Sequence, residues 1–234
     1  AYNNGQLARA QEYVKKHNCN ITFTAAYGQS EAGSNCTFPS PEEYPYGDGN
    51  IGIPLPLCNM GIFKPGTTEE LGYNELGEIC KAGPGNMLGY DNEEATRKAL
   101  IKHEDGEVWL HTGDIGYVNE DGIFYVLTRG NSQRYGGGRL IALTMENRVV
   151  DANIEGVEDN FFVIIPDDEH PGYYLPYLYV VLEKGYTIED VADEINEVLE
   201  AHERPVAIYQ LPERPFFHFK TNRIGLTKQI QAVN

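Results

Sequence analysis

The sequence predicts a mixed α+β protein built from two successive parts, on the basis of three features. Residues 5–17 carry apolar side chains at helical spacing and precede a predicted strand at 21–27, which is typical of half an α/β unit. Short β-segments separated by turn residues then extend over about 36–129 and favour a small distorted β-barrel. Nearer the C-terminus, helices and strands alternate in a compact α+β pattern. The predicted fold is the tail of an α/β subdomain plus a barrel, followed by a compact α+β domain.

Length and charge limit the possible functions. The 234 residues have room for one large domain or two modest ones, and 41% of them are hydrophobic, as is usual for a globular protein. A formal net charge of -17 opposes general binding to nucleic acid or to anionic membranes, because both need clustered Lys and Arg. No apolar run approaches the roughly 18 residues of a membrane span. We therefore expect an acidic cytoplasmic protein with no nucleic-acid partner and no membrane span.

The four cysteines do not form a recognised motif. Cys19, Cys36, Cys58 and Cys80 show no C-x-x-C spacing and have no partner histidines at zinc-finger distances. Reduced thiols in the cytosol are the expected state.

Asp114 lies at the most informative point of the sequence. Residues 108–111 are apolar and aromatic and predict a strand, which Thr112 and Gly113 are expected to break. Two further strands are expected at 115–118 and 123–127. A carboxylate fixed between strands can accept two hydrogen bonds from a vicinal diol. The alternative is a structural one, since an Asp beside a Gly commonly caps a turn.

Residues 109–116, Trp-Leu-His-Thr-Gly-Asp-Ile-Gly, resemble a motif of the adenylate-forming enzymes. This family contains acyl-CoA synthetases, adenylation domains of peptide synthetases, and luciferases, and its motif is Trp/Tyr-x-x-Thr-Gly-Asp-x-Gly. The resemblance implies that Asp114 binds the ribose hydroxyls of ATP.

A second segment, Tyr-Gly-Gln-Ser-Glu at 27–31, resembles the Tyr-Gly-x-Thr-Glu element of the same family. By this resemblance Tyr27 and Gly28 line the adenine and AMP pocket. Ser30 replaces the Thr that contacts phosphate, and Glu31 helps to hold Mg²⁺, a hard cation that prefers oxygen ligands. Without the family context, such a polar segment would be interpreted as a plain loop.

Residues 83–90 resemble the Gly-Pro-x-x-Met-x-Gly-Tyr turn of the family, which is mainly structural. A phosphate-binding loop is disfavoured because no Lys-Ser/Thr pair and no helix follow the glycines. Asn92 is expected to cap a short helix at 93–100.

Arg129 ends the part that resembles the large domain of the family, where an Arg contacts the ribose. The predicted hinge comprises Gly130, Asn131 and Ser132, and Ser132 aligns where the family usually has Asp or Lys. The resemblance thus implies the C-terminal part of a large nucleotide-binding domain at 1–129 and a C-terminal lid domain at 133–234.

Within the predicted lid, residues 143–150 indicate a helix, and a strong apolar stripe at 188–199 indicates a second helix capped by Thr187. Strands are expected at 161–165, 176–182 and 206–211. The loop 134–138 and the Met-Glu-Asn at 145–147 depart from the family pattern.

Lys220 follows Leu211 and Pro212 and resembles the family lysine that meets the α-phosphate and the substrate carboxylate. The family has Gly before this lysine, whereas this chain has Phe219. A solvated surface lysine is the alternative, and His218 is a weaker rival for the same role.

The implied reaction joins a carboxylic acid and ATP into an acyl-adenylate and pyrophosphate, and then forms a thioester, with CoA as the expected thiol. ATP or AMP, Mg²⁺ and CoA are the implied cofactors and cosubstrate. The Gly-rich phosphate loop of the family is not among these residues, so this chain alone is expected not to adenylate. Two alternatives are a non-catalytic nucleotide-binding or regulatory descendant and an amino-acid adenylation domain of a peptide synthetase.

Overall fold

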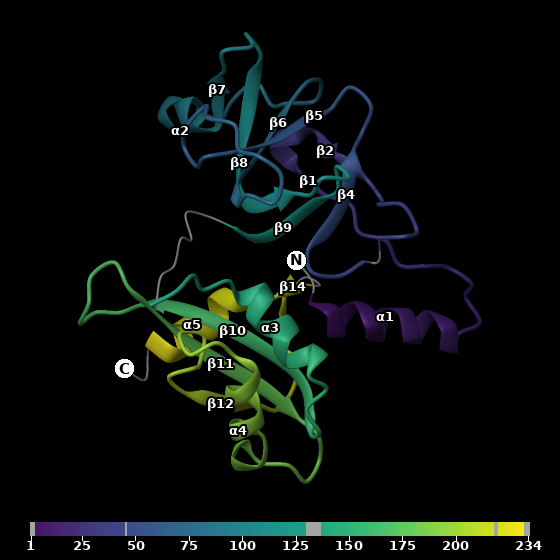
Figure 1. Cartoon of the computed structure of the whole chain (residues 1–234), viewed down its shortest axis with the longest axis vertical. Coiled ribbons are helices and arrows are strands. Elements are labelled where there is room, and N and C mark those ends of the chain that lie inside the picture. The colour runs from purple at the N-terminus through teal and green to yellow at the C-terminus, as the bar shows by residue number, and fades with distance from the viewer. Residues whose placement is uncertain (1–2, 45, 130–136, 218–219, 232–234) are drawn as a thin grey trace. The chain divides into compact units, whose positions relative to one another are not determined.

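The computed structural model describes residues 3–44, 46–129, 137–217 and 220–231 (Figure 1). The chain divides into two compact units. The first unit contains Ala1–Tyr2 and Leu7–Ser132, and the second unit contains Asn3–Gln6 and Gln133–Asn234. Among the described residues, none of the helices has both the length and the apolar character that crossing a membrane requires.

The chain begins with the predicted helix but lacks the predicted strand after it. Helix α1 spans Asn4–Lys16, with two lysines in its last turn. Residues 21–27 form no strand, so that expectation was wrong. No described strand runs beside this segment to complete a ladder. Instead the Gln11 amide donates to the Ile21 carbonyl and accepts from the Phe23 N–H, both at 2.9 Å, and these two apolar side chains stay exposed.

The first unit contains a two-stranded hairpin and a seven-stranded antiparallel sheet. The hairpin joins β1 (Gly28–Gln29) and β2 (Ser34–Asn35) through the 3-10 turn η1 (Ser30–Ala32). The sheet strands are β3 (Thr37–Phe38), β4 (Asn50–Pro54), β5 (Asn59–Phe63), β6 (Gly77–Ala82), β7 (Leu100–Lys102), β8 (Val108–Val118) and β9 (Phe124–Arg129). Their order is β3-β4-β9-β8-β6-β5, with β7 beside β8, and no pairing among the described residues joins β3 to β5. The sheet is curled, but its hydrogen bonds do not close it into a barrel among the described residues.

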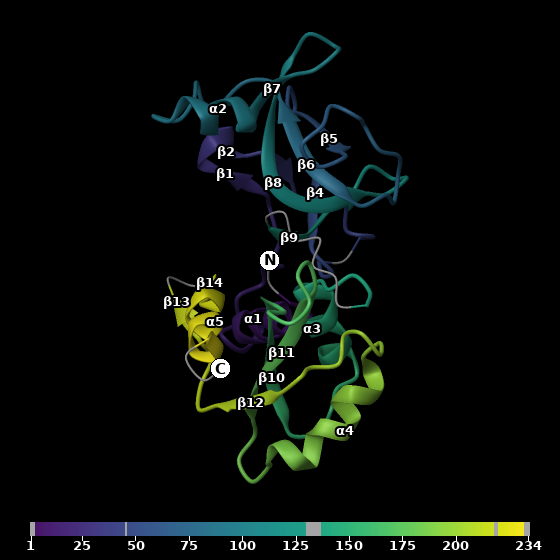
Figure 2. The same ribbon diagram turned by 90° about the vertical axis from the view of Figure 1, so that its left-hand side faces the viewer.

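Strand β8 continues through the point where the sequence predicts a break, and it is strongly curved (Figure 2). Cys80 of β6 pairs with His111 and Glu78 pairs with Ile115, so three residues of β8 lie opposite the single Ile79. A bulge of this kind absorbs extra residues and raises the local twist without ending the strand.

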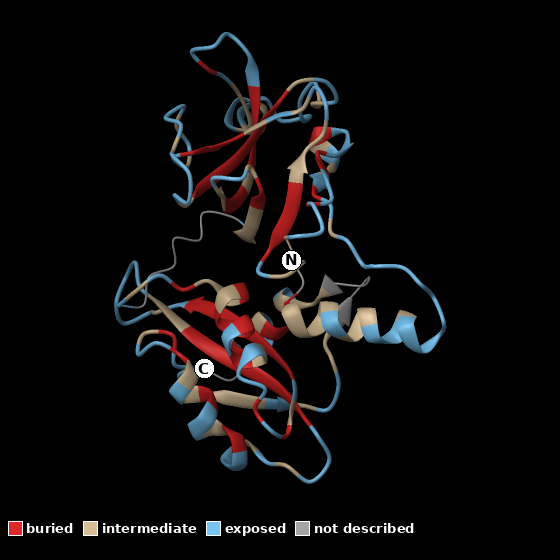
Figure 3. Cartoon of the chain, turned by 45° about the vertical axis from the view of Figure 1, so that its right-hand side comes forward, coloured by how far each residue is buried: buried red, intermediate tan, exposed pale blue. Residues whose placement is uncertain are grey.

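The first unit is stabilised by one main apolar cluster. Its buried members are Tyr27, Ala32, Cys36, Ile51, Ile62, Ile79, Leu110 and Phe124. These residues come from the hairpin and from the central strands, which appear as the buried ribbons of Figure 3. Outside this core, helix α2 (Glu93–Ala99) has the predicted cap, because the Asn92 side chain accepts from the Ala95 N–H at 2.9 Å.

The second unit is a three-stranded sheet with helices on both faces. Its elements are α3 (Ala142–Asp151), β10 (Val157–Pro166), β11 (Tyr174–Leu182), α4 (Ile188–Val198), β12 (Ile208–Leu211), β13 (Phe216–Phe217), β14 (Lys220–Thr221) and α5 (Arg223–Gln231). Strand β11 is central, antiparallel to β10 and parallel to β12. Helix α4 begins with a complete capping box between Thr187 and Asp190.

Successive residues of β10 enter opposite cores, as the two-residue period of a strand requires. Phe162 and Ile164 pack in the cluster that contains α3 and α4 side chains, whereas Phe161 and Val163 pack with residues of α5. Figure 2 shows α3 and α4 on one face of this sheet and α5 on the other. The continuous apolar runs of β10 and β11 are explained by burial on both faces.

The C-terminal helix is tied to the short hairpin that precedes it. Strands β13 and β14 pair antiparallel, and the Asn222 N–H donates to the Pro215 carbonyl at 2.7 Å. Leu226 and Ile230 anchor α5 in the sheet core, with 2% and 1% of their surfaces exposed.

A buried ion pair also fastens α5 to α3. Arg223 Nη1 lies 2.5 Å from Glu146 Oε1 and Nη2 lies 2.8 Å from Oε2, so the pair is bidentate. Glu146 is 1% exposed, and its Oε1 also accepts from the Phe162 N–H at 2.7 Å. The carboxylate therefore joins α3, β10 and α5.

We expect Arg223→Ala to lower the free energy of unfolding by about 3–5 kcal/mol, because it leaves the Glu146 carboxylate buried without its cation. Glu146→Gln should cost less, since it keeps an acceptor for the Phe162 N–H and leaves a partly exposed arginine that water can solvate. Urea denaturation measures both, with the exposed Arg204→Ala as control. Equal losses in the two variants would contradict this account.

Candidate functional site

Asp114 lies in the bulge of β8 and contacts two of the other predicted site residues. The Tyr27 hydroxyl donates to Asp114 Oδ2 at 2.5 Å. Arg129 of β9 is the cross-strand neighbour of Asp114, and its Nε lies 3.6 Å from Oδ1. The Arg129 side chain is 71% exposed, while Asp114 is 7% exposed. A buried carboxylate thus faces a guanidinium that reaches into solvent.

The electrostatics of this group follow from burial. Removal from water raises the pKa of the Asp114 carboxyl, and the Tyr27 hydrogen bond and the Arg129 charge oppose that rise. Burial and the Asp114 charge also raise the pKa of the Tyr27 phenol far above its usual range. Tyr27 therefore remains a hydrogen-bond donor at neutral pH.

Glu31 is connected to the same region through Tyr90. It lies in the first turn of η1, where the Tyr90 hydroxyl donates to Glu31 Oε1 at 3.0 Å. Partial burial and this contact with Glu31 raise the pKa of Tyr90, while the charge of Arg129 acts to lower it. The charge of Arg129 therefore acts at both the Asp114 carboxylate and the hydroxyl that holds Glu31.

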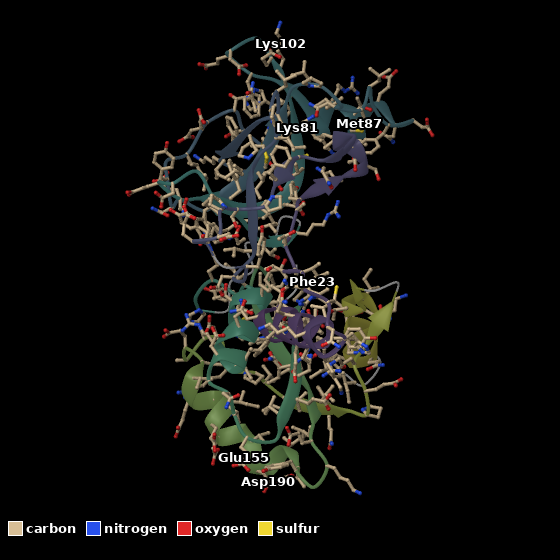
Figure 4. All side chains as sticks on the ribbon, turned by 90° about the vertical axis from the view of Figure 1, so that its right-hand side faces the viewer. Phe23, Lys81, Met87, Lys102, Glu155 and Asp190 are labelled. Atoms are coloured by element: carbon tan, nitrogen blue, oxygen red, sulfur yellow. The ribbon has the colours of Figure 1, made fainter. Side chains whose placement is uncertain are left out.

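The loop at 83–90 is hydrogen-bonded to η1. The Met87 N–H donates to the Glu31 carbonyl at 2.7 Å. Lys81, which is labelled in Figure 4 together with Met87, is only 2% exposed. It donates through Nζ to the carbonyl of Pro84 and to Asn86 Oδ1. A lysine ammonium has three donors and no acceptor, so these loop oxygens replace its water shell. Lys81 thereby fixes the loop that carries Tyr90.

Gly28 and Ser30 occupy the hairpin itself. A Cβ at Gly28 would lie 1.8 Å from the Ser34 carbonyl oxygen, so only glycine fits where β1 meets β2. Ser30 is exposed at the start of η1, and its carbonyl accepts from the Gly33 N–H. The hairpin therefore presents Ser30 and Glu31 side by side at its tip.

One group of buried side chains in the described part of the chain could offer metal ligands. Atoms of Glu78, Cys80 and His111 lie within 4.8 Å of one another. His111 Nδ1, however, lies 2.9 Å from Glu78 Oε2, and its Nε2 lies 3.0 Å from His103 Nε2. Burial and the Glu78 charge raise the pKa of the Cys80 thiol, whereas a metal ligand would be a thiolate. A hydrogen-bonded structural cluster explains these contacts.

Comparisons with known proteins agree on one family. The family model for AMP-binding enzymes matches residues 6–91. The 4-coumarate–CoA ligase 1 of Glycine max is 30% identical over 203 residues, which cover 85% of this chain and 65% of that protein. The luciferin 4-monooxygenase of Luciola mingrelica is 35% identical over 189 residues, covering 76% of this chain and 31% of the relative. The chain belongs to the adenylate-forming, AMP-binding enzyme family.

Solved structures of the family share the fold. ATP-bound MatB from Rhodopseudomonas palustris matches with a TM-score of 0.78 at 22% identity, over 96% of this chain and 43% of that one. The o-succinylbenzoate CoA synthetase of Bacillus subtilis, in complex with its acyl-adenylate intermediate, matches with a TM-score of 0.69 at 27% identity, over 93% and 43%. The chain thus spans less than half of these structures and about a third of the luciferin monooxygenase.

The structure brings only some of the family residues together. Tyr27, Asp114 and Arg129 are in contact, and Glu31 is linked to them through Tyr90. The predicted hinge residues Gly130, Asn131 and Ser132 lie outside the described residues. Lys220 begins β14, and its side chain likewise lies outside the described part of the chain.

Three supporting residues were not predicted. Tyr90 was assigned only to a structural turn, and neither Lys81 nor Glu78 was singled out at all. The tyrosine ends the Gly-Pro-x-x-Met-x-Gly-Tyr motif, so its presence in a family turn was the available signal. Two charged residues in the short predicted β-segment around Gly77–Ala82 were a signal too, because an unpartnered charge is rarely buried.

Asp114→Asn should change the pH dependence of stability. Because the folded pKa is raised, the native state keeps the proton over the pH interval in which the unfolded state has lost it. The contribution of Asp114 is therefore most favourable at low pH and is lost as pH rises through the folded pKa. We expect the stability difference of D114N from wild type to be absent at low pH and to move in favour of D114N toward neutrality.

Urea denaturation across pH 3–8 measures this difference, with the exposed Asp91→Asn as control. A D114N profile parallel to the wild-type profile would contradict the raised pKa.

Proposed function

We propose that this chain is the C-terminal part of an ATP-dependent, AMP-forming carboxylate ligase of the acyl-CoA synthetase type. The observation that carries the proposal is the Asp114 carboxylate in the β8 bulge, in contact with Tyr27 and Arg129 and connected through Tyr90 to Glu31. Curated relatives that act as CoA ligases, such as the 2-succinylbenzoate–CoA ligase of Oceanobacillus iheyensis, support it.

In this proposal Asp114 and Arg129 bind the ribose. A vicinal diol offers two O–H donors, and a carboxylate offers two acceptor oxygens at matching spacing. Tyr27 occupies one side of Asp114 Oδ2 and leaves Oδ1 and the other side of Oδ2 for the ribose. Arg129 can reach ribose oxygens from the exposed end of β9. The low exposure of Asp114 strengthens a hydrogen bond made there, because water competes less.

Glu31 fits a role as a magnesium ligand. Mg²⁺ at phosphates is usually held by one or two carboxylates together with phosphate oxygens and water, so a single acidic side chain is enough. Glu31 is partly exposed, and the hydrogen bond from Tyr90 fixes its position. Bound Mg²⁺ would neutralise phosphate charge, while the chain orients the nucleotide and presents Ser30 to phosphate.

Lys220 is the proposed cation for adenylation. A positive charge near the α-phosphate and the acid carboxylate would stabilise negative charge that develops as the acyl-phosphate bond forms and pyrophosphate leaves. Rotation of the second unit about residues 130–132 would then move Lys220 away from the adenylate and let CoA, the proposed thiol, reach it. The partners are thus a carboxylic acid and CoA, and the proposed location is the cytoplasm.

A second candidate is a nucleotide-binding descendant without catalysis. It is favoured by the departures near the hinge and by Phe219, which stands where the family has Gly before the lysine. An amino-acid adenylation domain of a peptide synthetase is a third candidate and would pass its acyl group to a carrier domain.

Lys220→Ala in the complete ligase should lower ATP–pyrophosphate exchange by roughly 100-fold or more, because it removes a positive charge that stabilises the transition state. The assay uses the acid that supports exchange best in a panel that includes 4-coumarate and 2-succinylbenzoate. Lys228→Ala, on the exposed side of α5, is the matched control and should keep wild-type exchange. An unchanged rate in K220A would remove Lys220 from the site, whereas a complete ligase without exchange on any acid of the panel would favour the non-catalytic candidate.

The 234-residue chain by itself should show no acid-dependent pyrophosphate exchange. The Gly-rich phosphate loop of the family is not among its residues, so the leaving pyrophosphate would lack its main backbone donors. Measurable exchange above a no-acid blank would show that these residues suffice.

A further inference from the structure

The bulge that presents Asp114 would leave backbone groups without partners. Three residues of β8 lie opposite Ile79, so the regular ladder cannot satisfy all of their donors. Side chains complete the bonding. Thr112 Oγ1 donates to the Ile79 carbonyl at 2.6 Å and accepts from the Asp114 N–H at 3.1 Å. A further donor of this segment is the Gly113 N–H.

Glu78 accepts that donor and two others. Its Oε1 accepts from the Gly113 N–H at 3.0 Å. Its Oε2 accepts from the Gly66 N–H at 3.2 Å and from His111 Nδ1 at 2.9 Å. Burial opposes ionisation of Glu78, but these hydrogen bonds outweigh it and lower the pKa of its carboxyl. One carboxylate thus connects the turn after β5 with both ends of the bulge.

A rigid aromatic cluster orients this carboxylate. Since the carboxylate only accepts, His111 donates from Nδ1, and its Nε2 lies 3.0 Å from His103 Nε2. The His103 ring stacks on Trp109 with centroids 5.4 Å apart and meets Phe63 edge-on at 4.7 Å. Glu78 is therefore held from the protein core, on the side of the bulge away from solvent.

We infer that Glu78 is a positioning residue for nucleotide binding, acting through the Gly113 N–H to fix the direction of the adjacent Asp114 carboxylate. The inference rests on the proposed contact of Asp114 with the ribose hydroxyls. As a glycine, Gly113 could adopt several backbone conformations, and it has φ +73 in this bulge. The hydrogen bond from its N–H to Glu78 selects that conformation. Without Glu78 the carboxylate can still be charged, but its two oxygens lose their alignment with the diol.

The test compares AMP with 2′-deoxy-AMP, which lacks one ribose hydroxyl, by calorimetry on the complete ligase. Wild type should bind AMP about tenfold more tightly, the value of one hydrogen bond to a charged group. Glu78→Ala should bring the ratio of the two dissociation constants close to one. Glu78→Gln keeps one acceptor oxygen for the Gly113 N–H and should retain part of the preference.

Gly113→Ala provides a second, independent variant. Nothing lies within 4 Å of a Cβ at this position, so the substitution strains only the backbone and should also reduce the ratio. Ile195→Val removes a buried methyl group of α4 from the core of the second unit and should keep the wild-type ratio despite lower stability.

The outcomes separate the two proposals. A wild-type ratio in Glu78→Ala, Glu78→Gln and Gly113→Ala, together with a lost preference in Asp114→Asn, would overturn the positioning role alone. A wild-type ratio in Asp114→Asn would overturn the ribose contact and with it this inference. A reduced ratio in the Glu78 variants and in Asp114→Asn, with Ile195→Val unchanged, supports both.

Discussion

Asp114 is a carboxylate held almost entirely out of water, and much of the first unit is arranged around that charge. Desolvation of a carboxylate is costly unless hydrogen bonds and an opposite charge compensate for it. Tyr27 and Arg129 provide this compensation from two segments far apart in the sequence. Tyr27 and Asp114 belong to two motifs by which the family is recognised, so these motifs mark a buried charge and one of the groups that stabilise it, as well as groups proposed to contact a ligand.

The supporting contacts form a second layer beneath these motifs. Glu78 accepts a hydrogen bond from the bulge of β8. Lys81 donates to the loop at 83–90, whose Tyr90 contacts Glu31. Both side chains come from β6, which runs beside β8 through the middle of the sheet. A strand that contributes a buried anion and a buried cation can position two separate loops with respect to each other. Nucleotide and metal roles proposed for different loops would then share one rigid support.

Local sequence patterns predicted most helices and strands of the second unit, because its strands are buried on both faces and its α4 cap is a local signal. The same approach failed where the answer depends on distant partners. Residues 21–27 have strand composition but no described neighbour to pair with, and the Thr-Gly break in β8 became a bulge because β6 supplies side-chain acceptors. Asp114 and Glu31 were found from family motifs, whereas Glu78 and Lys81 act through the three-dimensional packing of one strand, which no motif records.

The hairpin that begins with β13 pairs two short antiparallel strands. Its return strand contains Lys220 and leads directly into α5, whose place on the sheet is set by Leu226, Ile230 and the Arg223–Glu146 pair. In the proposed function, the placement of Lys220 therefore depends on how α5 packs. Inherited changes in the apolar face of α5 would then imitate the loss of this lysine while leaving Tyr27, Asp114 and Arg129 intact, and a sequence survey restricted to the motifs would overlook them.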